Sequence, residues 1–335
     1  MRESLLQFGI SALVIVIAGT FLVKFADKIS EVTNLGRLFV GSILLAGATS
    51  LPEFLVDVSA VRHHMPDIAV GDLFGSSIFN LLILAIADLI HKGTSPIFSR
   101  ASSKHALLGA ISIGIASIAG LAIFLESKLV IPTFAGIGMG PILLTIAYFL
   151  GSRILYYDQK IYEAKVEHQP KIQDKKYPAI KAFTGYFLSA FVILIAAPYL
   201  SEAAGEIATL SGLGKTFIGT TLVAFSTSLP ELVSTIVAIR NRAYDLAVGN
   251  IFGSNTLNIV ILIPLDFFHH GSLLASVSPN HLLTCIATIL ITSVAIVGQL
   301  YQVEKRKLLI EPDALTIILL VILTNVSLYF LGQTH

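Results

Sequence analysis

The chain has 335 residues, of which 55% are apolar and only 13% are charged, and its formal net charge is +1. Soluble domains carry about 25% charged residues, so this composition excludes an ordinary soluble protein and predicts an integral membrane protein. The single cysteine, Cys285, excludes an internal disulfide. We expect the lipid bilayer as the surrounding medium and no nucleic-acid partner.

Apolar runs of roughly 20 residues are long enough to cross a hydrocarbon core of about 30 Å. We find ten candidate spans: 5–23, 38–62, 67–90, 104–124, 132–153, 180–200, 214–240, 245–265, 281–299 and 312–331. The first run is longer than the apolar region of a signal peptide and is not followed by a clean cleavage site. It is therefore predicted to be the first span.

Lys and Arg are distributed unequally between the two sides of these ten spans. Of the 22 basic residues, 18 fall on the side opposite the N-terminus. Because cytoplasmic loops carry the positive excess, both termini are predicted to lie outside, in a plasma (inner) membrane protein. The polar segment 154–179 is then a cytoplasmic linker. It separates a first five-helix repeat, 1–153, from a second, 180–335.

The pentapeptide TSLPE occurs twice, at 49–53 and at 227–231. With this offset of 178, segments 46–80 and 224–258 share 16 of 35 residues. The two repeat units, about 38–90 and 214–266, are separated by an odd number of crossings and must enter the bilayer from opposite sides. This predicts an all-α fold of ten transmembrane helices in two inverted repeats.

The repeated pentapeptide places a helix breaker beside an acid in an apolar run. Proline lacks a backbone donor and displaces the carbonyl four residues earlier. Pro52 and Pro230 are therefore expected to break their helices at the midplane and to loosen the carbonyls of residues 46–49 and 224–227. Two carboxylates, Glu53 and Glu231, together with the carbonyls of Thr49 and Thr227, would offer the oxygen ligands that Ca²⁺ prefers.

The segments "ATSLPE…GDLFGSSIFN" and "STSLPEL…GNIFGSNTLN" resemble the two alpha-repeats of the sodium/calcium exchanger family of calcium:cation antiporters. The resemblance implies alternating access, with spans one and six sliding across a rigid core. It also implies roles at matching positions: Glu53 and Glu231 bridge Ca²⁺, and the carbonyls of Thr49 and Thr227 complete that site. The other implied members of the site are Ser50, Ser228, Ser76, Ser254, Ala46, Ala224, Asn80 and Asn258.

The chain departs from the family pattern at the central position, because many exchangers have an aspartate where Asn258 stands. The first repeat instead carries Asp57 and Asp72, where the second carries Thr235 and Asn250. Our hypothesis is that Asp57 partly restores the missing charge, as a proton carrier. The alternative is that it pairs with a neighbouring helix or reaches the surface. The counter-ion, Na⁺ or H⁺, stays open.

Other polar residues are given ordinary roles. Asp88 and Asp266 are predicted to be solvated or capping residues near span ends. The histidines in the outer connections are predicted to be loop residues rather than metal ligands: His63, His64, His269 and His270.

An enzyme is not expected. The sequence has no HExxH or GxSxG motif, and Ala69 replaces the first glycine that an intramembrane aspartyl protease would need. A cation channel is a less favoured alternative to an antiporter. We expect no cofactor and no required protein partner; the ligands are the transported Ca²⁺ and Na⁺ or H⁺.

Overall fold

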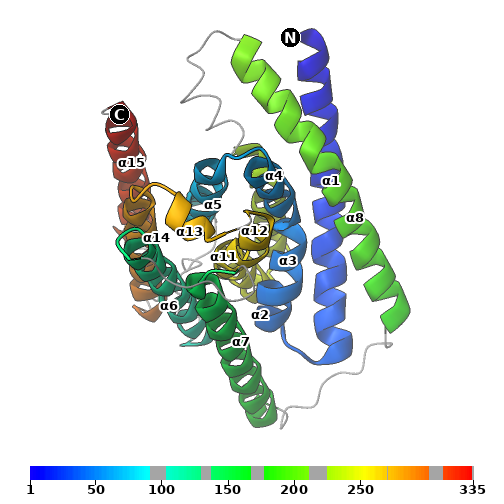
Figure 1. Ribbon diagram of the computed structural model, residues 1–335. Helices are drawn as coiled ribbons and strands as arrows, with labels where there is room; N and C mark the ends of the chain where they lie inside the picture. Colours follow the sequence, from blue (N-terminus) through cyan, green and yellow to red (C-terminus); the bar gives the residue numbers. More distant parts are fainter. Residues whose placement is uncertain are drawn as a thin grey trace.

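The computed structural model describes residues 1–90, 103–129, 137–166, 177–210, 225–269, 271–301 and 312–333, and these are predominantly helical. The long helices shown in Figure 1 are α1 (Arg2–Thr33), α5 (Pro66–Ile90), α6 (Ser103–Glu126), α7 (Met139–Val166), α8 (Ala179–Leu210), α11 (Tyr244–Val260), α14 (His281–Leu300) and α15 (Pro312–Gln333). The shorter elements are α2 (Arg37–Val40), the π-helix η1 (Gly41–Leu45), α3 (Ala46–Thr49), α4 (Leu51–Arg62), α10 (Leu229–Arg240), α12 (Leu262–His269) and α13 (Leu273–Ser276).

Within the described residues, eight helices are long and apolar enough to cross a membrane. The pair Arg37–Thr49 and Leu51–Arg62, bent by 44° at its break, is a ninth span if its two halves cross the membrane as one broken helix. The start of the predicted span 214–240 lies outside the described residues, which include its second half as α10. The ten-span count therefore stays a prediction, whereas the broken helix at 38–62 is confirmed.

Two helices form the interior of the bundle. In the most apolar stretch of Tyr244–His269, 78% of the residues are buried, and the share for α5 is 67%, whereas it is 22% for α15. Phe74 of α5 and Phe252 of α11 are fully enclosed. Helices α5 and α11 contact each other, both contact α10, and α5 also contacts α4. Polar side chains in their middle parts are therefore buried against protein: Ser76, Asn80, Ser254 and Asn258.

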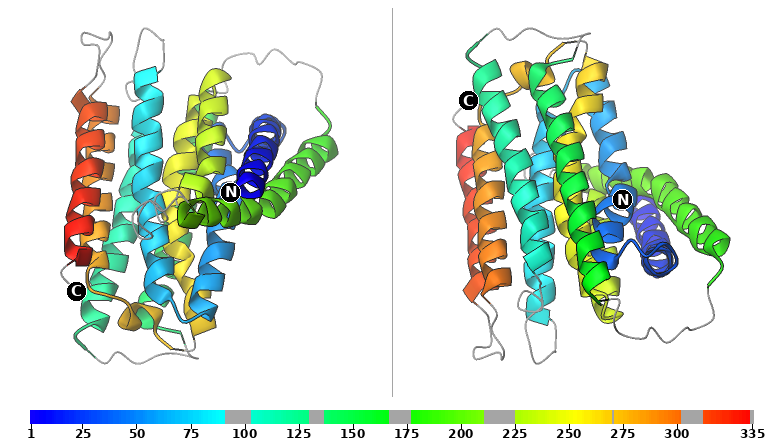
Figure 2. Two further views of the ribbon diagram at one scale, coloured as in Figure 1. Left: turned by 90° about the horizontal axis from the view of Figure 1, so that it is seen from above. Right: turned by 90° about the horizontal axis from the view of Figure 1, so that it is seen from below.

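Helices α1 and α8 pack along each other at one side of the bundle. Figure 2 shows this pair running across the direction of the remaining long helices. The pair is held by polar contacts as well as by apolar packing: the Ser4 hydroxyl donates to the Glu206 carboxylate at 2.7 Å, and the Gln7 amide donates to the Tyr199 carbonyl at 3.1 Å. These two helices contain the first and sixth predicted spans.

The helices differ from the predicted spans in two places. Helix α7 continues to Val166, so the first part of the predicted linker 154–179 is helical, while residues 167–176 lie outside the described part. The second difference is the π-helical turn at Gly41–Leu45, inside the first half of the broken span. Such turns leave the regular bonding ladder and are frequent at functional sites. The Leu44 carbonyl accepts a hydrogen bond from the Tyr186 hydroxyl of α8.

Candidate cation site between the two broken helices

Each TSLPE segment starts a new helix. Ser50 lies between α3 and α4 with φ −86° and ψ 1°, and Ser228 precedes α10 with φ −87° and ψ 7°. Proline is well tolerated in a first helical turn, because the N–H that it lacks has no partner there. Glu53 and Glu231 fall in the first turns of α4 and α10. Helix N-termini favour negative charge, so the breaks stabilise the two carboxylates at depth.

The expected loosening of carbonyls is wrong for Ala46. Its carbonyl accepts hydrogen bonds from the Ser50 N–H at 2.9 Å and from the Thr49 hydroxyl at 3.2 Å. The reason is that Pro52 opens a helix and does not interrupt a continuing one, so the preceding helix keeps its last bonds. Ala224, the equivalent position in the second repeat, lies outside the described residues.

The structure brings the two breaks together. The Ser50 hydroxyl donates to a Glu231 carboxylate oxygen at 3.3 Å, and the Ser228 hydroxyl donates to that of Ser76 at 3.4 Å. The Thr49 and Ser254 hydroxyl oxygens lie 3.5 Å apart. All three contacts join the first half of the chain to the second. Polar side chains of α3, α4, α5, α10 and α11 thus converge on one interior region.

Several oxygen atoms in this interior have no hydrogen-bond partner within the described part of the chain. Glu53, Glu231, Asn80 and Asn258 are completely buried. Among the described residues, both carboxylate oxygens of Glu53, one of Glu231, the amide oxygen of Asn80 and both amide atoms of Asn258 are unpaired. A buried polar group without a partner is costly, and a buried charge far more so. Carboxylate and amide oxygens left unpaired in this way are the ligands that a hard cation would satisfy.

Asp57 is another buried acid without a hydrogen-bond partner among the described residues. It is completely buried on α4, so the alternative that it reaches the surface is wrong. Neither of its carboxylate oxygens accepts a hydrogen bond from a described residue. Its counterpart in the second repeat, Thr235, is neutral and bonded, because its hydroxyl accepts a hydrogen bond from the Asn250 amide at 3.4 Å. The Asn250 amide oxygen accepts in turn from the Thr49 hydroxyl at 3.2 Å. Asp72, on α5, is partly buried and has one buried oxygen that is unpaired among the described residues.

Carboxylates alone do not make up a coordination shell here. Among the described residues, no three His, Cys, Asp or Glu side chains are placed to hold one metal ion. Glu231, Asp72 and Asp57 are acidic neighbours of Glu53. A cation bound between the breaks would therefore draw part of its shell from neutral hydroxyl, amide and carbonyl oxygens.

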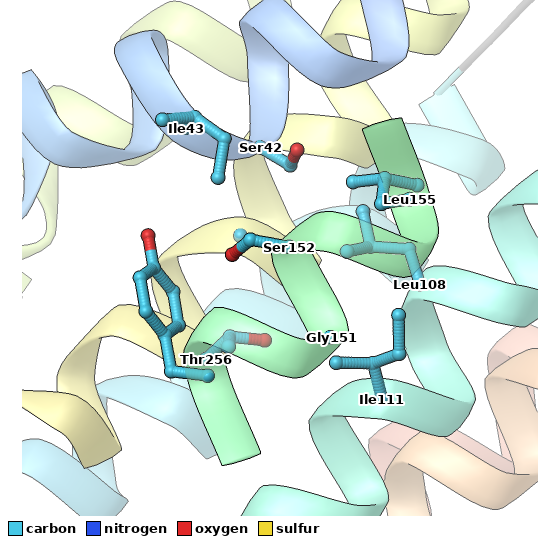
Figure 3. Close-up of a pocket in the computed structure, with 10 residues that line it drawn as sticks. Ser42, Ile43, Leu108, Ile111, Gly151, Ser152, Leu155 and Thr256 are labelled. Atoms are coloured by element: carbon cyan, nitrogen blue, oxygen red, sulfur yellow. The ribbon is translucent and has the colours of Figure 1, made fainter. Parts of the chain in front are cut away.

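A small cavity lies beside this region, between η1, α6, α7 and α11 (Figure 3). Its volume is about 10 Å³, enough for at most one water molecule. Ser42, Ser152 and Thr256 line it together with apolar residues, and no carboxylate of the described residues does. It is not a candidate cation site.

Some neighbours of the site were missed by sequence reasoning. Asn255 donates to the carbonyl of Ser77 and accepts from Asn80, each at 3.0 Å. The aligned motifs GSS and GSN contain Ser77 and Asn255, and this mismatch within the repeat is the signal that could have found them. Tyr186, on α8, is isolated in the sequence and gave no signal.

The predicted solvation of Asp88 and Asp266 is wrong, because both are completely buried. Asp266 accepts backbone N–H bonds from Gly138 and Leu273, each at 2.6 Å, and so caps the start of α13 as predicted. His63 and His64 are exposed, and His269 contacts the Ser276 hydroxyl; His270 lies outside the described residues.

A helical bundle this apolar, with acidic side chains enclosed in its interior, is that of an integral membrane protein with a candidate cation site. The family model described as "Sodium/calcium exchanger protein" matches residues 3–157 and 181–332. The chain therefore belongs to the sodium/calcium exchanger protein family, a family of membrane antiporters.

Individual relatives are consistent with this family. Inner membrane protein YrbG of Escherichia coli (strain K12) is 29% identical over 272 residues, 79% of either chain. Putative antiporter CaxA of Alkalimonas amylolytica is 27% identical over 248 residues, 71% of this chain and 72% of the relative. Sodium/calcium exchanger MaX1 of Methanosarcina acetivorans is 47% identical over 79 residues, 24% of this chain and 23% of the relative.

The fold is also that of a solved exchanger. The structure of sodium-calcium exchanger NCX_Mj soaked with 2.5 mM Na⁺ and 0.1 mM Ca²⁺ superposes with a TM-score of 0.73. The alignment covers 97% of this chain and 98% of the other, at 20% sequence identity. At this identity the similarity shows a shared fold.

Proposed function

We propose that this protein exchanges Ca²⁺ for Na⁺ across the membrane by alternating access, at one site shared by the two TSLPE breaks. The observation that carries the proposal is the pair of completely buried glutamates, Glu53 and Glu231. Both carboxylate oxygens of Glu53 and one of Glu231 have no hydrogen-bond partner among the described residues. Two negative charges in the bilayer interior are costly, at about 2.5–3.5 kcal/mol each on insertion scales. A bound Ca²⁺ would neutralise both.

The remaining ligands are assigned by position. Glu53 and Glu231 bridge Ca²⁺, with the carbonyls of Thr49 and Thr227, while Asn80 and Asn258 line the centre. The small and hydroxyl residues at the edges would help to hold Na⁺: Ser50, Ser228, Ser76, Ser254, Ala46 and Ala224. Contacts between the halves at Ser50–Glu231 and Ser228–Ser76 support a single shared site.

The proposed architecture is ten spans in two inverted repeats, with both termini outside and the linker 154–179 in the cytoplasm. Equivalent serines, Ser50 and Ser228, precede α4 and α10 with nearly equal backbone angles, which supports the repeat. The location of α1 and α8 together, across the direction of the other helices, fits a moving pair beside a core (Figure 2).

Ca²⁺ movement through this protein should be coupled to a gradient of the counter-ion. Purified protein in liposomes should accumulate radioactive Ca²⁺ when the lumen is loaded with Na⁺ and the outside is Na⁺-free, and should not do so when both sides have equal Na⁺ and equal pH. Alternating access couples the two fluxes, whereas an open pore does not require a counter-ion. Ca²⁺ entry that follows its own gradient regardless of Na⁺ and pH would indicate a channel.

Exchange of Ca²⁺ for H⁺ is the second candidate, and it is favoured by Asp57, buried and unpaired among the described residues, together with the neutral Asn258. Asp57→Asn should slow exchange by about tenfold, since ion affinity depends on the number of charged ligands. It should also flatten the dependence of the rate on pH. The measurement is Ca²⁺ uptake under an imposed pH or Na⁺ gradient at several pH values.

Asn258→Asp is the matched variant, because it returns a carboxylate to the centre. In the Asp57→Asn background it should restore uptake driven by Na⁺. Asp57→Asn with a full rate and an unchanged pH profile would show that Asp57 has no part in transport.

A further inference from the structure

Two His–Asp contacts occur at equivalent positions of the two halves. The His281 Nε2 atom lies 2.9 Å from an Asp67 carboxylate oxygen, and His105 Nε2 lies 2.9 Å from one of Asp245. Asp67 and Asp245 obey the offset of 178 and lie in the first turns of α5 and α11. The two histidines lie at the starts of α14 and α6. The contacts therefore repeat with the fold, although neither histidine falls in the TSLPE or glycine motifs.

The rings are enclosed while their partners face outward. The His105 side chain is 1% exposed and that of His281 is 14%, whereas Asp245 and Asp67 are 52% and 55% exposed. An enclosed ring cannot swing away as a surface ion pair does. Its Nε2–H can donate to the carboxylate whether the imidazole is neutral or charged. Each contact thus holds one helix start against another.

The four helices involved form a closed set. Helix α5 contacts α14, α14 contacts α6, α6 contacts α11, and α11 contacts α5. Ser76 and Ser254 follow Asp67 and Asp245 by about 14 Å along their helices, at 1.5 Å per residue. A shift of either helix start along its axis would be carried to the proposed cation ligands on the same rigid element.

We propose that these two pairs, Asp67–His281 and Asp245–His105, are positioning contacts that set where α5 and α11 present their ligands to the transported cation. The inference rests on the proposed function. It assigns a role to residues outside the ion site: the pairs fix the axial placement of the two ligand-bearing helices, one pair for each half of the site.

Each aspartate also interacts with groups other than its histidine, through a hydrogen bond at Asp67 and through nearby positive charge at Asp245. Asp67 also accepts the Ser278 backbone N–H at 2.7 Å. Asp245 has Arg37 and Lys104 as further charged neighbours, and Arg37 itself is held by both oxygens of Asp27, at 2.6 and 3.2 Å. In both pairs, loss of the aspartate should therefore weaken Ca²⁺ exchange more than loss of its histidine.

The test is a set of double-mutant cycles on Ca²⁺ exchange in liposomes. Asp67→Ala should raise the Ca²⁺ concentration for half-maximal rate by about fivefold, within the range of couplings between contacting residues. His281→Ala should raise it less, and the double variant should be no worse than Asp67→Ala. Asp245→Ala and His105→Ala should behave in the same way. His281→Gln, whose amide can donate to Asp67, should recover much of the affinity.

Crossed doubles are the control, since Asp67→Ala with His105→Ala joins residues from different pairs, and their effects should multiply. Equal coupling in matched and crossed doubles would overturn the proposal. So would variants that melt at lower temperature but keep the half-maximal concentration of the unmodified protein, because that outcome indicates a structural role alone. If the unmodified protein shows no Ca²⁺ exchange, the proposed function fails first and this inference fails with it.

Discussion

Glu53→Gln and Glu231→Gln should each reduce Ca²⁺ exchange to near the background of protein-free liposomes. Each change removes one charge and one strong oxygen ligand from a completely buried pair. Loss of one partner from a buried charged group costs about 3–5 kcal/mol, roughly a 10²- to 4 × 10³-fold loss in affinity. The measurement is uptake of radioactive Ca²⁺ into liposomes loaded with Na⁺, with a parallel pH-gradient series.

The same variants should fold well. A glutamine in place of a buried carboxylate removes a desolvation penalty, so without Ca²⁺ the melting temperature should equal or exceed that of the unmodified protein. Added Ca²⁺ should raise the melting temperature of the unmodified protein, because it binds the folded state, and should leave both variants unchanged. These paired readouts separate a lost site from a lost fold.

Glu31→Gln is the matched control. Its side chain is 47% exposed and pairs with Lys28 one turn away, so exchange should be normal. Normal Ca²⁺ exchange by both Glu53→Gln and Glu231→Gln would show that the cation binds elsewhere in the protein.

Gly253→Ala should destabilise the protein and weaken transport together. A Cβ atom at Gly253 would overlap the backbone carbonyl and Cα of Ser42 in η1. Neighbouring glycines are also close to backbone: a Cβ at Gly249 would lie 2.7 Å from the Leu38 carbonyl oxygen, and one at Gly41 would lie 2.8 Å from that of Leu246. The atoms in the way are backbone, so the two elements must separate. Such overpacking costs about 1–3 kcal/mol, occasionally more.

Moving η1 away from α11 would also displace a residue of the candidate cation site, because η1 continues directly into α3, which carries Thr49. The Thr49 and Ser254 hydroxyls, 3.5 Å apart, lie across the same interface. We therefore expect a lower melting temperature and a higher Ca²⁺ concentration for half-maximal rate. Thermal unfolding in detergent and exchange in liposomes measure the two effects.

Gly114→Ala is the comparison for this substitution. Gly114 lies in α6 and is exposed, and a Cβ atom added there would have no atom of the described residues within 4 Å, apart from its own helix backbone. Alanine at this position should therefore not destabilise the protein. If Gly253→Ala behaves like Gly114→Ala in both assays, the close packing of η1 on α11 does not matter for folding or transport.

Local chemistry determined where the two helices at the candidate site begin. Proline and the acid beside it are neighbours in the chain, so the helix starts at Leu51 and Leu229 and the placement of both glutamates in first turns follow from the pentapeptide itself. The apolar runs likewise predicted the long helices, since their length is set by the bilayer. The prediction that the Ala46 carbonyl is loosened was wrong, because a proline that starts a helix leaves the preceding helix intact.

Other features depend on segments that are distant in the sequence. The sequence showed that Asp57 and Thr235 differ between the two copies, but not what either side chain contacts. Among the described residues Asp57 is unpaired, while Asn250 and Thr235 bond each other. Asp88 was expected to be a solvated or capping residue, and its complete burial excludes the solvated role. Burial and pairing are properties of what surrounds a side chain, and those surroundings come from other helices.

The sequence by itself determined that the chain crosses a membrane, where two of its helices break, and which two acids stand at those breaks, because each depends on residues adjacent in the chain. Only the tertiary structure decided which side chains meet across the halves: Ser50 with Glu231, Thr49 with Ser254, and the histidines with Asp67 and Asp245. Those meetings require helices to approach to backbone contact at Gly249 and Gly253, a distance set by packing rather than by any local pattern.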